Sequence, residues 1–301
     1  MRVLIGVDGS AMSDGAVQLA GRLLSAEDDE ILFYYSPPGT HSVQGGPLQP
    51  VQVYLSDAVF EKARQQLPEP LRKRVQTVAS AREASHGLLL AGLDRQCDLI
   101  VIGARGTGPV RERSLGSLSQ HVVDHATIPV LVVRCDESRA TRPLHLLLAS
   151  DGSQASRHAS KVLNRFSWPP ETSGTAITVI EPEDQHNLPE WLQVQLDDQQ
   201  LAALGMGQFG CDANCEARVR QEAAKWYGDL PAIFAGHDPL VAVGHAGQEV
   251  LAAVAANRID LVVVGARRLG PISRLLLGST SSLVVAHAPC SVLVIRAPKE
   301  R

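Results

Sequence analysis

Residues 98–134 read DLIVIGARGTGPVRERSLGSLSQHVVDHATIPVLVVR, and residues 260–296 read DLVVVGARRLGPISRLLLGSTSSLVVAHAPCSVLVIR. The two stretches match without a gap at an interval of 162 residues, so that Arg134 corresponds to Arg296. A repeat of this length is too long for a solenoid unit. The sequence therefore predicts two copies of one small domain.

The beginnings of the two halves match as well. VLIGVDGS at residues 3–10 corresponds to LLLASDGS at residues 146–153, at an interval of 143 residues. The interval of 162 later in the chain leaves 19 extra residues in the second half, which we place within residues 181–238. A length of 301 residues suits two domains. The expected organisation is a first domain, a polar linker and a second domain at residues 1–137, 138–143 and 144–298.

Short apolar runs alternate with segments of helical spacing in the first half. The expected strands are residues 3–7, 31–35, 75–78, 99–102 and 130–133. The expected helices are residues 13–24, 51–67, 83–96 and 117–126. The second half repeats this order. Strands that alternate with helices are typical of a parallel sheet covered on both faces. The sequence thus predicts an α/β protein with two doubly wound, Rossmann-like domains, each with a mainly parallel five-stranded sheet.

Composition argues against several classes of protein. The formal net charge is −4 and neither half is basic, which argues against nucleic acid as a partner. No apolar run reaches the roughly 18 residues of a membrane span, and we find no signal peptide. The five cysteines are scattered and odd in number, as in a reduced protein. We therefore expect a cytoplasmic protein without membrane segments.

A glycine-rich segment follows the fourth expected strand. Gly103 ends that strand, and Gly106 and Gly116 come three and thirteen residues later. Glycine-rich turns offer free N–H donors to a phosphate. Ser117 is expected to cap the next helix, in a capping box with Gln120. Because a helix N-terminus attracts anions, the segment predicts an anion site.

Asp8 ends the first expected strand. Ligands of doubly wound sheets bind beyond the carboxyl ends of the strands, where the strand order reverses. If the first and fourth strands are neighbours, Asp8 and the glycines face one crevice, and the carboxylate can bind a ribose or a base. Alternatively, Asp8 caps the helix that begins near Ser13 or binds its own loop.

Other reactive residues do not form an evident catalytic or metal site. His125 and His287 lie at equivalent positions in the last turn of a helix, where a structural role is favoured. Cys211 and Cys215 have no further ligand pair for zinc. The remaining cysteines are expected in or near the core: Cys97, Cys135 and Cys290. Arg105, Arg111 and Arg113 are either a phosphate-facing cluster or solvated loop residues. No P-loop is present, so a nucleotide bound here would at most be hydrolysed slowly.

A strand ending in Asp-Gly-Ser, followed later by G-x2-G-x9-G-S, a helix and a strand, resembles the universal stress protein family in its tandem form. The resemblance implies a flavodoxin-like fold that binds ATP. It also implies a dimerisation edge at the last strand, so that residues 130–133 and 292–295 would pair the two halves as an internal pseudo-dimer. The nucleotide-binding residues that it implies are Val7, Asp8, Ile102, Gly103, Arg105, Gly106, Gly116, Ser117 and Leu118.

The second half departs from this family pattern at one position. Arg268 stands where the second glycine is expected, and its side chain would either crowd the phosphate or bind it directly. The weaker second set of binding residues is Asp151, Gly265, Arg268, Gly278 and Ser279. We therefore expect the first half to bind nucleotide more tightly than the second.

The expected function is that of a cytoplasmic stress-response regulator. It would bind ATP or a related adenine nucleotide, with or without Mg²⁺, and act on a protein partner without dedicated catalysis. The alternative is a scaffold or adaptor that works through protein contacts alone. Pairing of the halves allows a monomer, while a further homodimer stays open.

Overall fold

The computed structural model describes residues 1–39, 46–106, 115–134, 142–151, 154–181, 221, 230–266 and 277–296, without the side chains of 154–157. The elements of the first half are β1 (Arg2–Gly6), α1 (Ala11–Leu23), β2 (Glu30–Tyr35), α2 (Pro50–Gln65), α3 (Glu69–Arg72), β3 (Val75–Ala79), α4 (Ala84–Asp94), β4 (Leu99–Gly103), α5 (Ser117–His125) and β5 (Val130–Val133). Those of the second half are β6 (His145–Ala149), α6 (Gln154–Leu163), β7 (Ser173–Ile180), the 3-10 turn η3 (Ala232–Phe234), β8 (Leu240–Val243), α10 (Ala246–Ala256), β9 (Leu261–Ala266), α11 (Ser279–His287) and β10 (Ser291–Arg296).

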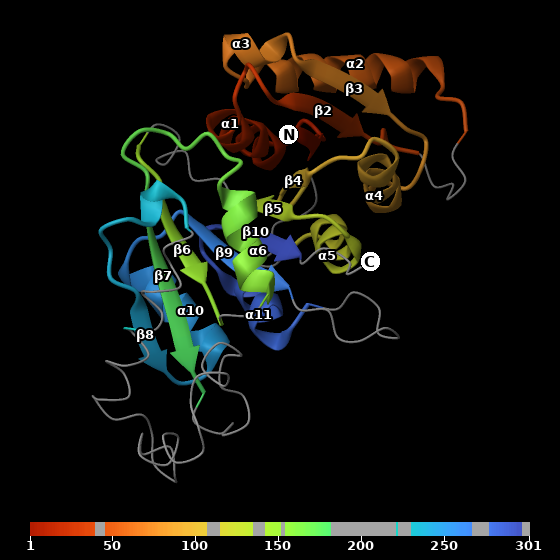
Figure 1. Ribbon diagram of the computed structural model, residues 1–301. Helices are drawn as coiled ribbons and strands as arrows, with labels where there is room; N and C mark the ends of the chain where they lie inside the picture. Colours follow the sequence, from red (N-terminus) through yellow and green to blue (C-terminus); the bar gives the residue numbers. More distant parts are fainter. Residues whose placement is uncertain are drawn as a thin grey trace.

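The strands of both halves form one continuous sheet, in the order β3-β2-β1-β4-β5-β10-β9-β6-β7-β8. Neighbouring strands within each half are parallel. β5 and β10 pair antiparallel, with Val132 opposite Val292, and they lie side by side where the halves meet (Figure 1). This confirms the predicted pairing of residues 130–133 with 292–295. The predicted fold class is also confirmed.

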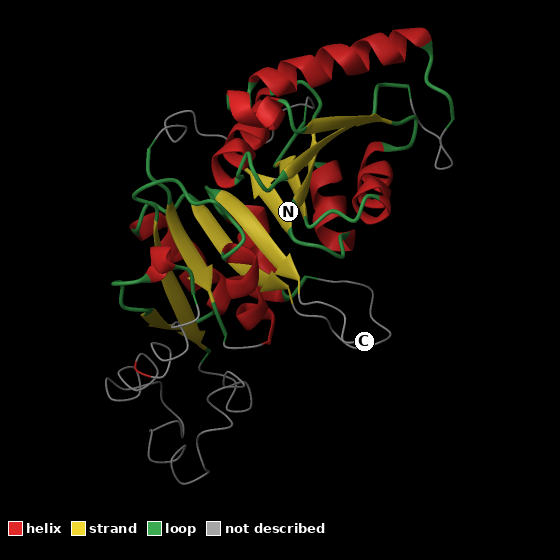
Figure 2. Ribbon diagram, turned by 45° about the horizontal axis from the view of Figure 1, so that its top comes forward, coloured by secondary structure: helices red, strands yellow, loops and turns green. Residues whose placement is uncertain are grey.

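Helices cover both faces of this sheet (Figure 2). One face packs against α1, α2 and α6, and the other against α4, α5, α10 and α11. The central strands are buried on both faces, and Val132 and Val292 are fully buried. Near-continuous apolar strands are what a parallel sheet covered on both faces requires.

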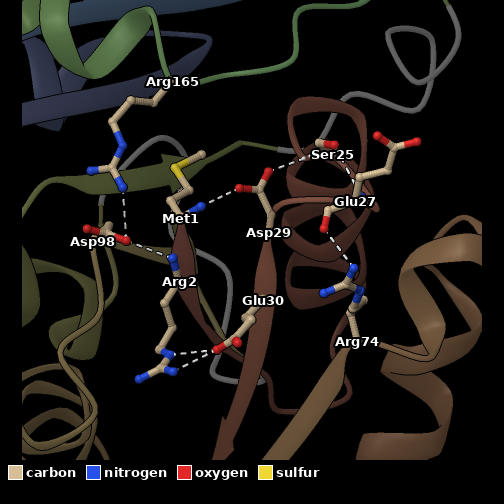
Figure 3. A network of polar contacts seen from close by, with 9 residues as sticks. All are labelled: Met1, Arg2, Ser25, Glu27, Asp29, Glu30, Arg74, Asp98 and Arg165. Atoms are coloured by element: carbon tan, nitrogen blue, oxygen red, sulfur yellow. Dashed lines mark hydrogen bonds and ion pairs between the residues drawn. The ribbon is translucent and has the colours of Figure 1, made fainter.

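Polar contacts also cross the junction of the halves. Arg165, just after α6, contacts Asp98 at 3.1 Å, and Asp98 also accepts the main-chain N–H of Arg2 at 2.7 Å (Figure 3). Asp260 is the equivalent of Asp98 in the second half and accepts the main-chain N–H of His145 at 2.9 Å. Asp98 therefore links β4 to the start of β1, and Asp260 links β9 to the start of β6.

The structure refines some of the expected boundaries. The helix expected at residues 51–67 ends at Gln65, and a separate short helix, α3, follows Pro68. Most of residues 181–238, where the extra residues were placed, lie outside the described part of the chain. Among the residues that are described, no helix is long and apolar enough to span a membrane.

Candidate functional site

A cavity of about 410 Å³ opens at the carboxyl ends of β1, β2 and β4, beside α4 and α5. β1 and β4 are adjacent and parallel, and the strand order reverses between them. The cavity thus lies where ligands of doubly wound sheets usually bind. All nine residues expected in the first half line it: Val7, Asp8, Ile102, Gly103, Arg105, Gly106, Gly116, Ser117 and Leu118.

Gly103 brings the end of β4 close to α1. A Cβ atom at this position would lie 3.0 Å from the Cβ of Met12 and 3.1 Å from the carbonyl oxygen of Arg105. The hydroxyl of Ser119 donates to the carbonyl oxygen of Gly103 at 2.8 Å, which joins the first turn of α5 to β4. The strand end and the helix start are therefore held together at the cavity floor.

The N-terminus of α5 has no side-chain cap. The expected capping box is wrong, because Gly116 takes the N-cap position and Ser117 is already the first helical residue. The side chain of Gln120 contacts Asp124 instead, at 3.0 Å. Helix N-termini leave several N–H groups without intrahelical partners. Since Gly116, Ser117 and Leu118 line the cavity, this helix terminus is directed at the space where an anion would bind.

Asp8 accepts a hydrogen bond from its own loop and also faces the glycine segment, but it does not cap α1. One carboxylate oxygen accepts the main-chain N–H of Ser10 at 2.9 Å, within its own loop. The other faces the glycine segment, because a Cβ atom on Gly106 would lie 2.6 Å from it. The cap of α1 is Ser10, whose hydroxyl accepts the N–H of Ser13 at 3.2 Å. Asp8 is therefore a fixed carboxylate on the cavity wall.

The end of β2 and the residue after it line the cavity with side chains that the sequence interpretation missed, namely Tyr34, Tyr35 and Ser36. The ring of Tyr35 meets that of Phe60 from α2 edge to face, with centroids 6.4 Å apart. Burial raises the pKa of Tyr34 and of Tyr35, and the carboxylate of Asp8 raises that of Tyr35 further. Because β2 lies beside β1 and ends at the same edge, the strand order itself is the signal that would have found these residues.

The repeated domains allow comparison with known proteins. A model of the universal stress protein family matches the chain twice, over residues 1–134 and 144–296. The chain belongs to the universal stress protein family. A universal stress protein of Mycolicibacterium smegmatis is 28% identical, over 98% of this chain and 96% of its own length.

Solved structures of universal stress proteins share the fold. One from Archaeoglobus fulgidus has a TM-score of 0.63 and 19% identity, and the match covers 100% of this chain and 97% of that one. A smaller universal stress protein, 21% identical over 44% of this chain and 96% of its own length with a TM-score of 0.32, was solved in complex with cAMP.

The second universal stress protein domain repeats part of the site. Gly278 is the N-cap of α11, Ser279 is its first residue, and no side chain caps this helix either. The hydroxyl of Ser281 donates to the carbonyl oxygen of Gly265 at 2.7 Å, as Ser119 does to Gly103. Asp151 follows β6, as Asp8 follows β1. Arg268 lies outside the described residues.

The two domains of this universal stress protein differ at the end of their second strand. The register of β6 with β7 places Ile177 and Thr178 where β2 has Tyr34 and Tyr35. In addition, the carboxylate of Glu181 accepts the N–H of Ala246 at the start of α10, at 2.7 Å. At these two strand positions, only the first domain has aromatic side chains.

The remaining candidate residues take structural positions where they are described. His125 and His287 end their helices, and each Nδ1 lies within 3.1 Å of the carbonyl oxygen four residues earlier. Cys97 and Cys290 are buried thiols that form no disulfide. Among the described residues, no group of three ligands could hold a metal ion. The candidates that fall outside the described residues are Arg111, Arg113, Cys135, Cys211 and Cys215.

Proposed function

We propose that this universal stress protein is a regulator that binds ATP or a related adenine nucleotide in the first-domain cavity, without dedicated catalysis. One observation carries the proposal: the uncapped N-terminus of α5 and the carboxylate of Asp8 line the same cavity. A helix N-terminus favours phosphate, and a fixed carboxylate accepts hydrogen bonds from ribose hydroxyls.

The shape of the cavity supports the same ligand. Apolar side chains of Ala84, Leu88 and Ile102 and the ring of Tyr34 line it and offer a wall for a planar base. A volume of about 410 Å³ lies within the range usual for small-molecule sites. Arg105, which also lines the cavity, adds a positive charge for the phosphates.

We propose weaker binding, or none, in the second domain. The aromatic residues of β2 are replaced there by Ile177 and Thr178. Arg268 replaces the glycine equivalent to Gly106. In the first domain, a Cβ atom at Gly106 would crowd Asp8. Both differences disfavour nucleotide binding in the second domain.

Calorimetric titration of the whole protein with ATP, with and without Mg²⁺, tests the proposal. Wild type should bind about one ATP per chain, while Asp8→Asn should lose most of that affinity, because the amide keeps the shape and loses the charge. Asp151→Asn is the matched control in the second domain and should leave the main site unchanged. An absence of heat for wild type, together with no nucleotide released on denaturation, would contradict the proposal.

A role in protein contacts is the second candidate, and one surface favours it. Val51, Tyr54 and Leu55 lie on the first turns of α2 and are exposed, Tyr54 by 73%. Exposed apolar side chains that gather on one helix often mark a contact with another protein. If ATP does not bind, a nucleotide-independent adaptor becomes the better assignment, and loss of partner binding in Tyr54→Ser would support it.

A further inference from the structure

Two arginines cross the junction of the halves, and each reaches a helix of the other half. Arg134 follows β5, and its Nη2 donates to the carbonyl oxygens of Val285 and Ala286 in α11, at 3.0 and 3.2 Å. Arg296 ends β10, and its Nη2 donates to the carbonyl oxygen of Val123 in α5. Val123 and Val285 are equivalent in the repeat, so the two contacts are reciprocal.

Each contact stabilises the C-terminal end of a helix. The last carbonyl groups of a helix lack intrahelical partners, and a positive charge there is favourable. Arg296 is only 3% exposed, so its interaction with α5 is shielded from water. A charged hydrogen bond in such surroundings is stronger than a neutral one.

The helix that Arg296 holds is the one that faces the first cavity. α5 has nine residues and is therefore about 13 Å long. Its first turn lines the cavity and is joined to β4 by Ser119. Its last turn is joined to the second half by Arg296. One short helix thus connects the candidate phosphate site to the junction of the halves.

We propose that Arg296 is a positioning residue for the first cavity, through which the second half sets the nucleotide affinity of the first. The inference rests on the proposed function and extends it to regulation. Arg296 orders α5 and thereby the N–H groups at its start, which the phosphates need in a fixed arrangement. Because coupling between two equilibria is reciprocal, nucleotide in the first cavity also stabilises the contact of Arg296 with α5.

Arg134 provides a matched control, since it makes the equivalent contact with α11. Lysine is the substitution of choice at both positions, because it keeps the charge and loses the planar guanidinium. The charge at Arg134 is kept because it interacts with the charge of Arg105, which lines the cavity. Burial lowers the pKa of the Arg134 guanidinium, and the positive charge of Arg105 lowers it further. Arg134→Lys therefore leaves the charge near the cavity unchanged.

The experiment compares Arg296→Lys and Arg134→Lys in the whole protein by hydrogen exchange without ligand and by ATP calorimetry. Arg296→Lys should raise amide exchange throughout α5 and weaken ATP binding about fivefold. Arg134→Lys should raise exchange in α11 and leave ATP affinity within about twofold of wild type. Melting temperatures of both variants should fall, since each variant loses a contact between the halves.

The possible failures are distinguishable. Wild type that binds no ATP would overturn the proposed function, and the inference with it. Wild type that binds ATP, with both variants weakened equally or with exchange of α5 unchanged in Arg296→Lys, would overturn the inference alone. A loss of affinity in Arg296→Lys only, together with faster exchange at the start of α5, would support it.

Discussion

Gly106 leaves no room for a side chain beside the carboxylate of Asp8, because a Cβ atom there would lie 2.6 Å from one carboxylate oxygen. Gly106→Ala should displace that carboxylate and lower ATP affinity about tenfold, or ~1.4 kcal/mol. Gly46→Ala is the control, since no atom lies within 4 Å of a Cβ at that position. Calorimetry should show the loss in the first variant alone. Equal affinities would mean that Asp8 does not contact the ligand.

Cys97 makes stability depend on pH in the alkaline range. Burial raises the pKa of its thiol from 9.0 to about 11, and the charge of Arg2 opposes this only in part. A thiol with a raised pKa in the folded state stabilises the protein below pH 9, and this contribution is lost as the pH rises through 11. Burial also raises the pKa of Tyr34 and Tyr35, so some fall in stability is expected in any variant. Urea unfolding of wild type should therefore show a steeper fall in stability between these pH values than unfolding of Cys97→Ala. Parallel pH profiles would contradict the assignment.

At the scale of single elements, α5 and α11 are anchored in the same way, by Ser119 to Gly103 and by Ser281 to Gly265. Both serines are buried. Replacing either by alanine leaves a carbonyl group without its partner, which costs about 1–3 kcal/mol. Ser119→Ala and Ser281→Ala should lose similar stability in urea, while only Ser119→Ala should weaken ATP binding. If both weaken it, the first cavity is not the main site.

Local patterns predicted much of this architecture from sequence. The apolar runs located the strands, and the repeat located the glycine segments, because both depend on neighbouring residues. The cap of α5 was misplaced by one residue, since the choice between Gly116 and Ser117 depends on how the loop returns to β4. The side chains of Tyr34 and Tyr35 were missed because only the strand order brings the end of β2 to the cavity.

The two arginines show the limit of such prediction. The repeat made Arg134 and Arg296 equivalent, but nothing local indicates that each side chain reaches into the other half. That direction follows from the antiparallel pairing of β5 with β10, a contact between residues far apart in the chain. Contacts of this kind are set by the whole fold rather than by the sequence near them.

At the scale of the whole molecule, β5 lies inside the sheet only because β10 covers its edge. Val130 and Val132 are fully buried there. An apolar edge strand without its neighbour is a template for pairing with another chain. Residues 1–137 expressed alone should therefore dimerise through β5, with a mass by light scattering about twice that of the fragment. Val132→Lys in this fragment should abolish the dimer. A soluble monomer of the unsubstituted fragment would show that the junction is not needed to cover this edge.

The most direct test of the nucleotide site is a crystal structure of the whole protein grown with ATP. The proposed site predicts one nucleotide in the first-domain cavity, with phosphates at the main-chain N–H groups of Ser117 and Leu118 and the ribose beside Asp8, because the N–H of Gly116 already donates to the carbonyl oxygen of Ala104 at 2.9 Å. It also predicts little or no density at the start of α11. Nucleotide bound only at α11, or a first cavity that stays empty at saturating ATP, would contradict it.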